Sequence, residues 1–176
     1  MDQDAAQAGS VSRIVDSDTK AWDRIVKYDT EMDISEFICG NNEMDLWFRQ
    51  DAFEWHQHNK CAVYLALDAQ NRVVGFYTLS AHYVQTRIVP RQVQEEVKGQ
   101  GNWPCLLLGR FAVDKRFRGQ GHLLLDEAIE TARSVQQEVG VQFLFVEAIN
   151  DEVSDWYEGH GFHRSPKNRR HLLYPL

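Results

Sequence analysis

Hydrophobic and polar residues follow two different periods along the chain, and these periods separate helices from strands. Apolar residues recur every three or four positions within residues 43–58 and again within 122–139, which places them on one face of an α-helix. Shorter runs rich in β-branched and aromatic residues are typical of strands. Such runs predict strands at residues 61–67, 73–79, 106–113 and 142–148 and two short β pieces ending at Tyr174, with a further short helix at 152–158.

The order of these elements predicts both antiparallel and parallel strand pairs. The first two predicted strands flank a polar turn at Asp68–Arg72, so we expect them to form a hairpin. The strand at 106–113, the long helix after it and the next strand make a βαβ unit, whose strands run parallel. Gly109 interrupts the apolar run of that strand and indicates a β-bulge. We therefore expect one α/β (α+β) domain over residues 23–176, after a loose polar arm over residues 1–22.

These elements fit a single domain of ordinary composition. The chain has 176 residues, 43% of them hydrophobic, and a domain of this size can bury a core without disulfides or metal. No apolar run approaches the roughly 18 residues of a membrane span, and the N-terminus lacks the pattern of a signal peptide, so we expect a cytoplasmic protein with no membrane contact. Cys39, Cys61 and Cys105 are far apart in the sequence and are expected to be reduced thiols, with no metal site.

Acidic residues are concentrated at the front of the chain. Residues 1–60 carry 13 acidic and 6 basic side chains, whereas residues 61–176 carry 13 of each, and the net charge is −7. An acidic protein is a poor default binder of nucleic acid, because contact with phosphates depends on local lysines and arginines. One group of cations could supply that contact or could form a solvated rim: Arg164, Lys167, Arg169 and Arg170, with Arg87, Arg91 and Lys98.

The segment Arg116-Phe-Arg-Gly-Gln-Gly121, between the strand and the helix of the βαβ unit, has the features of a phosphate site. Two glycines ahead of a helix let the backbone approach a ligand, and the unpaired N–H groups of the first helical turn attract an anion. Two arginines stand beside them. Taken alone, the pattern fits a tight surface turn equally well, and it matches neither the Walker loop nor the dinucleotide fingerprint.

Further motifs, in order along the chain, make residues 35–176 resemble the GNAT superfamily of acyl-CoA N-acyltransferases. Arg-x-x-Gly-x-Gly after an apolar strand is followed by Asn150, and then by Tyr157-x-x-x-Gly-Phe162 after the next strand. Three segments more narrowly resemble the GNAT-type toxins of bacterial toxin–antitoxin pairs: Phe37-x-Cys-Gly-Asn41 before Met44-Asp-Leu-Trp47, the strand Leu108–Asp114, and the closing His171–Leu176.

The resemblance implies a GNAT fold, with a central mixed, mostly antiparallel sheet, a splayed parallel strand pair and helices on both faces. It also implies acetyl-CoA as co-substrate, with its pyrophosphate on the loop amides and its pantetheine arm along the strand before the loop. Phe117 departs from the family pattern, which often has glycine there, and the turn after Asp114 is shorter than usual. The residues implied in cofactor binding are Phe111, Ala112, Val113, Arg116, Arg118, Gly119, Gln120, Gly121, His122 and Asn150.

Two of these side chains have a second interpretation from the residues themselves. His122 opens the predicted helix and could be a solvent-exposed residue rather than a phosphate ligand. Asn150 could cap a turn rather than contact the cofactor.

The resemblance also implies a catalytic residue, because the family pattern puts the hydroxyl of Tyr157 beside the thioester sulfur. A phenol with a pKa of about 10 is protonated at neutral pH and can give its proton to a departing thiolate. Trp156 and Tyr157 also fit a pair of core aromatics. A main-chain N–H freed by the bulge, that of Val113, could polarise the thioester carbonyl. Glu147 is the candidate general base, and a solvent-facing strand residue is an equal alternative.

Chemistry without a strong base favours an α-amine as the acceptor. A lysine amine with a pKa of about 10.4 is almost wholly protonated at neutral pH, whereas an α-amine at about 7.7–8.0 is partly free. The resemblance implies that this amine belongs to aminoacyl-tRNA, that its acetylation blocks translation, that an antitoxin binds the protein, and that the protein is a homodimer. Two other hypotheses stay open: an acetyltransferase acting on a small amine or a protein N-terminus, and a binding module that holds acetyl-CoA without catalysis.

Overall fold

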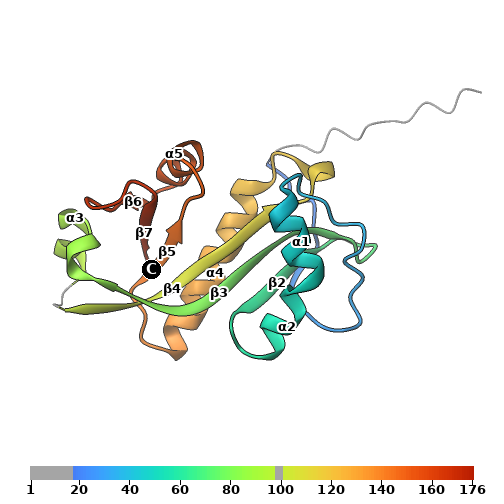
Figure 1. Cartoon of the computed structure of the whole chain (residues 1–176), viewed down its shortest axis with the longest axis horizontal. Coiled ribbons are helices and arrows are strands. Elements are labelled where there is room, and N and C mark those ends of the chain that lie inside the picture. Colours follow the sequence, from blue (N-terminus) through green and yellow to red (C-terminus); the bar gives the residue numbers. More distant parts are fainter. Residues whose placement is uncertain (1–17, 98–100) are drawn as a thin grey trace, which may run out of the picture.

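The strands pair into one sheet, shown in Figure 1, in a computed structural model that describes residues 18–97 and 101–176. Within these residues seven strands lie in the order β1-β2-β3-β4-β5-β7-β6. Neighbouring strands are antiparallel except β4 and β5, which run parallel, so the predicted mixed sheet and its βαβ unit are confirmed. The strands are β1 Arg24–Lys27, β2 Ala62–Leu67, β3 Val73–Gln85, β4 Asn102–Val113, β5 Phe143–Glu147, β6 His163–Arg164 and β7 His171–Pro175.

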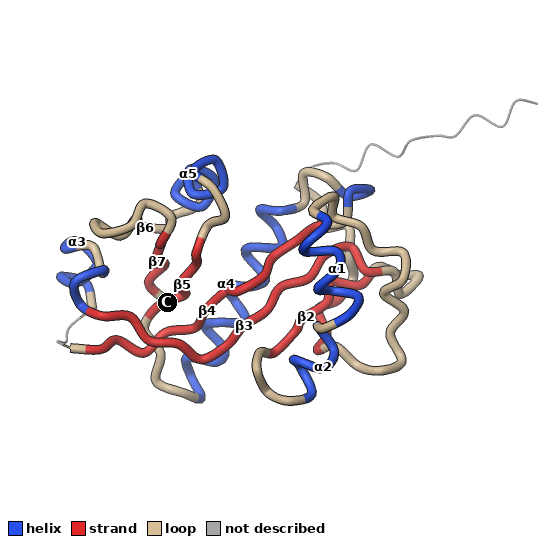
Figure 2. The backbone as a smooth tube through the Cα atoms, viewed as in Figure 1, coloured by secondary structure: helices blue, strands red, loops and turns tan. Residues whose placement is uncertain are grey.

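Helices cover both faces of the sheet, as predicted (Figure 2). The long helix α4 packs on one face, and α1 and α2 pack on the other. No helix within the described ranges is both long enough and apolar enough to cross a membrane. The helices are α1 Asn42–Gln50, α2 Ala52–Gln57, α3 Arg91–Glu96, α4 Gly121–Glu138 and α5 Asp151–Gly159.

Strand β2 shows how alternation in the sequence builds these two layers. Val63 and Leu65 belong to the core under α1 and α2, whereas Tyr64 and Ala66 belong to the core under α4. Successive side chains of a strand point to opposite faces, so a short apolar run can bury residues in both cores. Each fully buried Val or Leu contributes about 1.5–3 kcal/mol of transfer free energy.

The prediction of one helix over residues 43–58 is wrong, because the helix breaks at Asp51 into α1 and α2. The N–H of Asp51 donates to the carbonyl of Trp47 and closes α1, and its backbone then leaves ideal helical geometry. The break lets Trp55 of α2 pack edge-on against Trp47 of α1, with ring centroids 5.7 Å apart. Strand β1 was not predicted, since its two apolar residues are flanked by Arg24 and Lys27.

A β-bulge in β4 divides the sheet into two regions. Leu79 of β3 pairs with Leu108, but Tyr77 pairs with Phe111, so β4 contains one extra residue at Gly109-Arg110. The bulge predicted from Gly109 is therefore confirmed. The parallel pairing of β4 with β5 also ends here, at Leu107, and beyond that point the two strands diverge (Figure 1).

The described end of the predicted N-terminal arm packs against the domain. Residues 1–17 of that arm lie outside the described residues. Trp22 is buried in the core under α4, and the N–H of Ala21 donates to the side-chain oxygen of Gln120 at 2.9 Å. The amide nitrogen of Gln120 in turn donates to the carbonyl of Thr19 at 3.1 Å. The segment just before β1 is thus bonded to the residue that precedes α4.

Replacement of Gly75 by Ala is expected to destabilise the fold, because β3, β4 and α4 meet at this residue. An added Cβ would lie 2.8 Å from a methyl group of Leu124 and 2.9 Å from the carbonyl oxygen of Ala112. Since the carbonyl belongs to a paired strand, we expect Gly75→Ala to lower the free energy of unfolding by about 1–3 kcal/mol. Chemical denaturation measures this change.

Gly140→Ala is the matched control, because an added Cβ there meets no heavy atom within 4 Å. Its unfolding free energy should stay within about 0.5 kcal/mol of the parent. Equal stability of the Gly75→Ala and Gly140→Ala proteins would contradict the packing described here.

Candidate active site

A cleft opens where β4 and β5 separate. It has a volume of about 250 Å³ and lies between the second half of β4, the end of β5 and helix α5. Met44 of α1 also borders it. The lining includes Gly109, Arg110 and Phe111 of β4, Glu147 of β5, and Trp156 and Tyr157 of α5.

The edge of β4 that faces this cleft presents free main-chain donors. The N–H of Asp114 donates to the carbonyl of Val74 in β3 at 2.8 Å. Because N–H directions alternate along a strand, Ala112 also points its N–H toward β3, and those of Phe111 and Val113 point to the opposite edge. The donor predicted at Val113 therefore lies on the open edge, and Phe111, next to the bulge, supplies a second one.

The predicted phosphate loop is a tight turn that leads into α4. Gly119 has a φ of +93°, a conformation that favours glycine, and it sets the direction of the chain before the helix. The N–H groups of Gly121, His122 and Leu123 have no acceptor within the described part of the chain. Gln120 has no side-chain capping bond to the helix, and its own N–H donates to the carbonyl of Phe117. The start of α4 is thus an uncapped row of donors that suits an anion.

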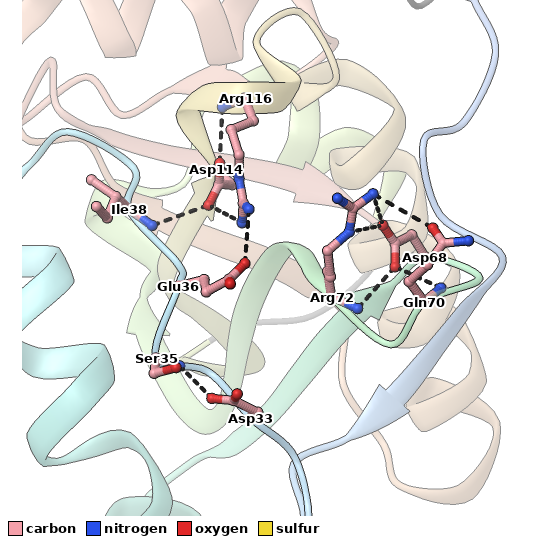
Figure 3. A network of polar contacts seen from close by, with 9 residues as sticks. All are labelled: Asp33, Ser35, Glu36, Ile38, Asp68, Gln70, Arg72, Asp114 and Arg116. Atoms are coloured by element: carbon pink, nitrogen blue, oxygen red, sulfur yellow. Dashed lines mark hydrogen bonds and ion pairs between the residues drawn. The ribbon is translucent and has the colours of Figure 1, made fainter.

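The two arginines of the loop have different environments, although they are two residues apart. The guanidinium of Arg116 holds Asp114, with Nε 2.8 Å from Oδ1 and Nη2 3.0 Å from Oδ2, and it also contacts Glu36 at 3.2 Å (Figure 3). Arg118 is exposed and forms no ion pair with any described residue. The Arg118 side chain is therefore free for a ligand, whereas that of Arg116 supports the turn.

Asp114 holds this turn together from a buried position. Its side chain accepts from the main-chain N–H of Arg116 at 2.8 Å and from that of Ile38 at 3.1 Å (Figure 3). Burial alone would raise the pKa of Asp114, but these hydrogen bonds and the charge of Arg116 outweigh it and lower the pKa below its usual value. The carboxylate is thus ionised at neutral pH and connects β4 to the segment before α1.

Tyr157 lies at the cleft with most of its ring enclosed. It is 6% exposed, and its ring packs against Trp156 and Phe162 at centroid distances of 5.0 and 5.1 Å. The hydroxyl has no hydrogen-bond partner among the described residues, and it is not one of the fully enclosed polar atoms. Burial raises the pKa of Tyr157 above its usual value, so the hydroxyl keeps its proton at neutral pH.

Trp156 connects this tyrosine to the loop. Its ring lies 6.0 Å from that of Phe111, and an added Cβ on Gly121 would be 3.5 Å from its Cζ2 atom. The prediction that Trp156 is a packing residue agrees with these contacts. The cleft, the open edge of β4 and the start of α4 are thus brought together by one aromatic side chain.

The other predicted side chains have simpler surroundings. The Oδ1 of Asn150 accepts from the N–H of Val153 at 2.8 Å, so Asn150 caps α5, which was one of its two interpretations. His122 is half-buried and has no side-chain partner in the described ranges. Glu147 borders the cleft and is 60% exposed, with Oε1 3.7 Å from Nε2 of His171.

Arg110 lines the cleft but was not predicted to be a site residue. Its guanidinium lies over the ring of Trp47 at 4.4 Å, and its N–H donates to the hydroxyl of Thr78. A charged residue inside an otherwise apolar strand, directly after the glycine of the bulge, was the available signal. Among the described residues, no group of three or more His, Cys, Asp or Glu side chains could hold a metal ion.

Comparisons with known proteins agree with this geometry. The profile of the acetyltransferase (GNAT) family matches residues 28–162. The chain is 30% identical over 144 residues to a tRNA-acetylating toxin of Mycobacterium tuberculosis, covering 80% of this chain and 84% of that protein. It is similar to the structure of AtaT complexed with acetyl-methionyl-tRNAfMet, with a TM-score of 0.79, 26% identity, and coverage of 86% and 94% of the two chains. It is also similar to AtaTR bound with AcCoA, with a TM-score of 0.72, 26% identity, and coverage of 86% and 92%.

Removal of each loop arginine is expected to have a different effect. Arg116→Gln leaves the buried Asp114 without its charged partner, and because Arg116 is 37% exposed to screening solvent we expect a loss of about 1–2 kcal/mol in unfolding free energy. Arg118→Gln should leave stability unchanged and should weaken acetyl-CoA binding about tenfold, because it removes an unpaired cation beside the uncapped start of α4. Thermal denaturation and calorimetric titration with acetyl-CoA measure the two effects. A stable Arg116→Gln protein together with an unstable Arg118→Gln protein would reverse these assignments.

Proposed function

The chain belongs to the acetyltransferase (GNAT) family, and on this basis we propose that it is a toxin that transfers the acetyl group of acetyl-CoA to the α-amino group of aminoacyl-tRNA and so blocks translation. One observation carries the proposal: a protonated, cleft-lining Tyr157 lies close to a free strand edge and an uncapped helix start. These are the groups that a phosphate-linked thioester requires. The similarity to a tRNA-acetylating toxin supports the choice of acceptor.

The residues of the loop and strand fit acetyl-CoA as co-substrate. The N–H groups at the start of α4 and the side chain of Arg118 would hold the pyrophosphate. The pantetheine arm would lie along the open edge of β4, where Phe111 and Val113 offer donors and Ala112 does not. The resemblance also assigns His122 and Asn150 to the cofactor; the side-chain oxygen of Asn150 caps α5, which leaves its amide nitrogen for such a contact.

The chemical step follows from these positions. The free amine of the acceptor attacks the thioester carbonyl, and one main-chain N–H on the open edge of β4 stabilises the negative charge that develops on the oxygen. The carbon–sulfur bond then breaks, and the hydroxyl of Tyr157 donates its proton to the sulfur. The new amide nitrogen loses its extra proton to water or to Glu147, and Tyr157 regains a proton from solvent. Acetylated acceptor and free coenzyme A are the products.

The exposure of the carboxylate at the cleft supports an α-amine as acceptor. Glu147, the one carboxylate in the described lining, is mostly exposed, so no enclosed carboxylate lies at the cleft to take a proton from the acceptor. An α-amine with a pKa of about 7.7–8.0 is partly deprotonated without assistance, whereas a lysine amine is not. An aminoacyl ester therefore fits this site better than a lysine side chain.

Three further features of the proposal depend on the toxin function. A site whose donors are already in place needs a cognate antitoxin protein to keep it inactive. Charged tRNA is a cytoplasmic substrate, so the protein acts in the cytoplasm. A homodimer is the oligomeric state that the family resemblance implies, and analytical ultracentrifugation would test it.

Tyr157→Phe is expected to abolish most activity without loss of stability, because the hydroxyl makes no hydrogen bond within the described chain. Loss of a general acid should lower kcat by about 10²-fold or more while the KM for acetyl-CoA changes little. The assay is transfer of labelled acetyl from acetyl-CoA to charged tRNA, with spermidine and peptides as competing acceptors. Tyr83→Phe is the matched control, since Tyr83 is 59% exposed and does not line the cleft.

In cells, expression of the wild-type protein should arrest growth, and Tyr157→Phe should relieve the arrest. Normal growth in the presence of folded wild-type protein would contradict the toxin function. Transfer to spermidine or peptides but not to charged tRNA would contradict the proposed acceptor and leave the acetyltransferase activity intact.

The pH dependence of the reaction rate should follow the pKa of the acceptor amine rather than that of Tyr157. Because the pKa of Tyr157 lies above its usual value of about 10, its hydroxyl stays protonated throughout the range of an enzyme assay. Between about pH 6 and 9 the rate should rise as the α-amine of the acceptor loses its proton and then level off. Initial rates with charged tRNA across this range check the profile. A decline between about pH 8 and 9 would indicate that Tyr157 loses its proton there, contrary to the effect of its burial.

A further inference from the structure

A second hollow adjoins the acetyl-CoA cleft at the bulge of β4. It has a volume of about 240 Å³, lies between α1, α2 and strands β2 to β4, and shares Gly109 and Arg110 with the first cleft. Through Cys61 and Ser80 it continues into a third hollow of about 210 Å³. Together the second and third hollows form what we call the α2 groove.

The α2 groove is cationic, although it belongs to the acidic part of the molecule. Its described lining includes Lys27, Lys60 and Arg110 as cations, together with the ring of His56, and contains no Asp or Glu. Residues 1–60, which contribute most of these cations, carry 13 acidic and 6 basic side chains. The acids of this region therefore lie elsewhere, and the groove attracts negative charge locally.

The cations of the groove have no carboxylate partners among the described residues. Lys60 lies over the ring of Trp55 at 5.3 Å, and Arg110 lies over the ring of Trp47 at 4.4 Å. Such stacking holds each cation at the wall without neutralising it. Lys27 also forms no ion pair with any described residue.

The groove also offers a neutral hydrogen-bond donor. Nδ1 of His56 accepts from the N–H of Val63 at 3.1 Å, so Nε2 carries the ring proton. The indole Nε1 of Trp47 has no acceptor among the described residues, but it is fully enclosed and is therefore not open to a ligand.

The other group of cations that could contact phosphates, which we call the C-terminal basic cluster, differs from the α2 groove because half of its described members are paired with carboxylates. Its members are Arg164, Lys167, Arg169 and Arg170, with Arg87, Arg91 and Lys98. Arg164 is paired with Asp155 and Glu158, and Arg170 with Asp151. Arg91 is likewise paired with Glu95, and Lys98 lies outside the described residues. Only Arg87, Lys167 and Arg169 of the described members are without a carboxylate partner, and none of them lines either cleft at the bulge.

We propose that the α2 groove holds the acceptor end of the tRNA, with the amino group at the Gly109-Arg110 bulge and the sugar-phosphate chain along Lys60, His56 and Lys27. This inference rests on the proposed function and specifies where its substrate binds. The groove meets the acetyl-CoA cleft at the two residues where transfer must occur. A single-stranded, anionic and oxygen-rich ligand matches its cations and the free donor of His56.

The test is the double variant Lys27→Gln/Lys60→Gln, assayed with charged tRNA between about 50 and 200 mM salt. Removal of two phosphate-binding lysines should raise the KM for aminoacyl-tRNA about tenfold and leave the KM for acetyl-CoA unchanged. The dependence of log KM on log salt should become shallower by about 0.7 for each phosphate that the variant no longer binds. The matched control is Lys167→Gln/Arg169→Gln, which removes the same charge from the C-terminal cluster and should change this KM by less than about twofold.

A minimal acceptor separates phosphate binding from other effects. An aminoacyl adenosine carries the amine, ester and ribose but no phosphodiester, so its KM should be the same with the wild-type protein and with Lys27→Gln/Lys60→Gln. An unchanged KM for aminoacyl-tRNA, or a rise equal to that of the control variant, would overturn the inference. If the wild-type protein binds acetyl-CoA but acetylates no aminoacyl-tRNA at all, the proposed function itself fails.

Discussion

The extra residue in β4 is the constraint on which the other features of the site depend. In a regular ladder, β4 and β5 would stay paired along their whole length and every donor between them would be used. The insertion at Gly109-Arg110 coincides with the end of that pairing, and the strands then diverge. The same local event opens the cleft, leaves the N–H groups of Phe111 and Val113 without strand partners, and turns Arg110 toward Trp47. One irregular position thus produces the open edge and the junction between two hollows.

The turn after β4 is held by a cluster of polar contacts around Asp114. Asp114 binds the backbone of its own turn and that of Ile38, and Arg116 closes the cluster. Lys115 further donates its N–H to the carbonyl of Ile38. The segment before α1 and the loop before α4 are therefore fixed to each other. Since α1 carries Trp47 and α4 begins at the predicted phosphate loop, the two regions that we propose to bind ligands share one support.

The sequence predicted the elements whose pattern is local and strong. The apolar stripe of α4 gave its bounds to within one residue, and Gly109 marked the bulge correctly. The break at Asp51 and strand β1 were not predictable from periodicity, because the first depends on how Trp55 meets Trp47 and the second on pairing with β2. Periodicity describes a face, but it does not identify the partner that covers it.

The residue types predicted which chemistry the site could perform, but not which of its side chains are free to contact a ligand. Arg116 and Arg118 look equivalent in the sequence, and only the position of Asp114 and Glu36 separates a structural arginine from a free one. Gln120 belongs to the predicted loop, but its side chain bonds a segment 99 to 101 positions away. That bond also means that the geometry of the loop depends on the very start of the described chain. A chain that begins after Ala21 would lose both hydrogen bonds of the Gln120 side chain and, with them, the anchor of the loop that we propose for the phosphates.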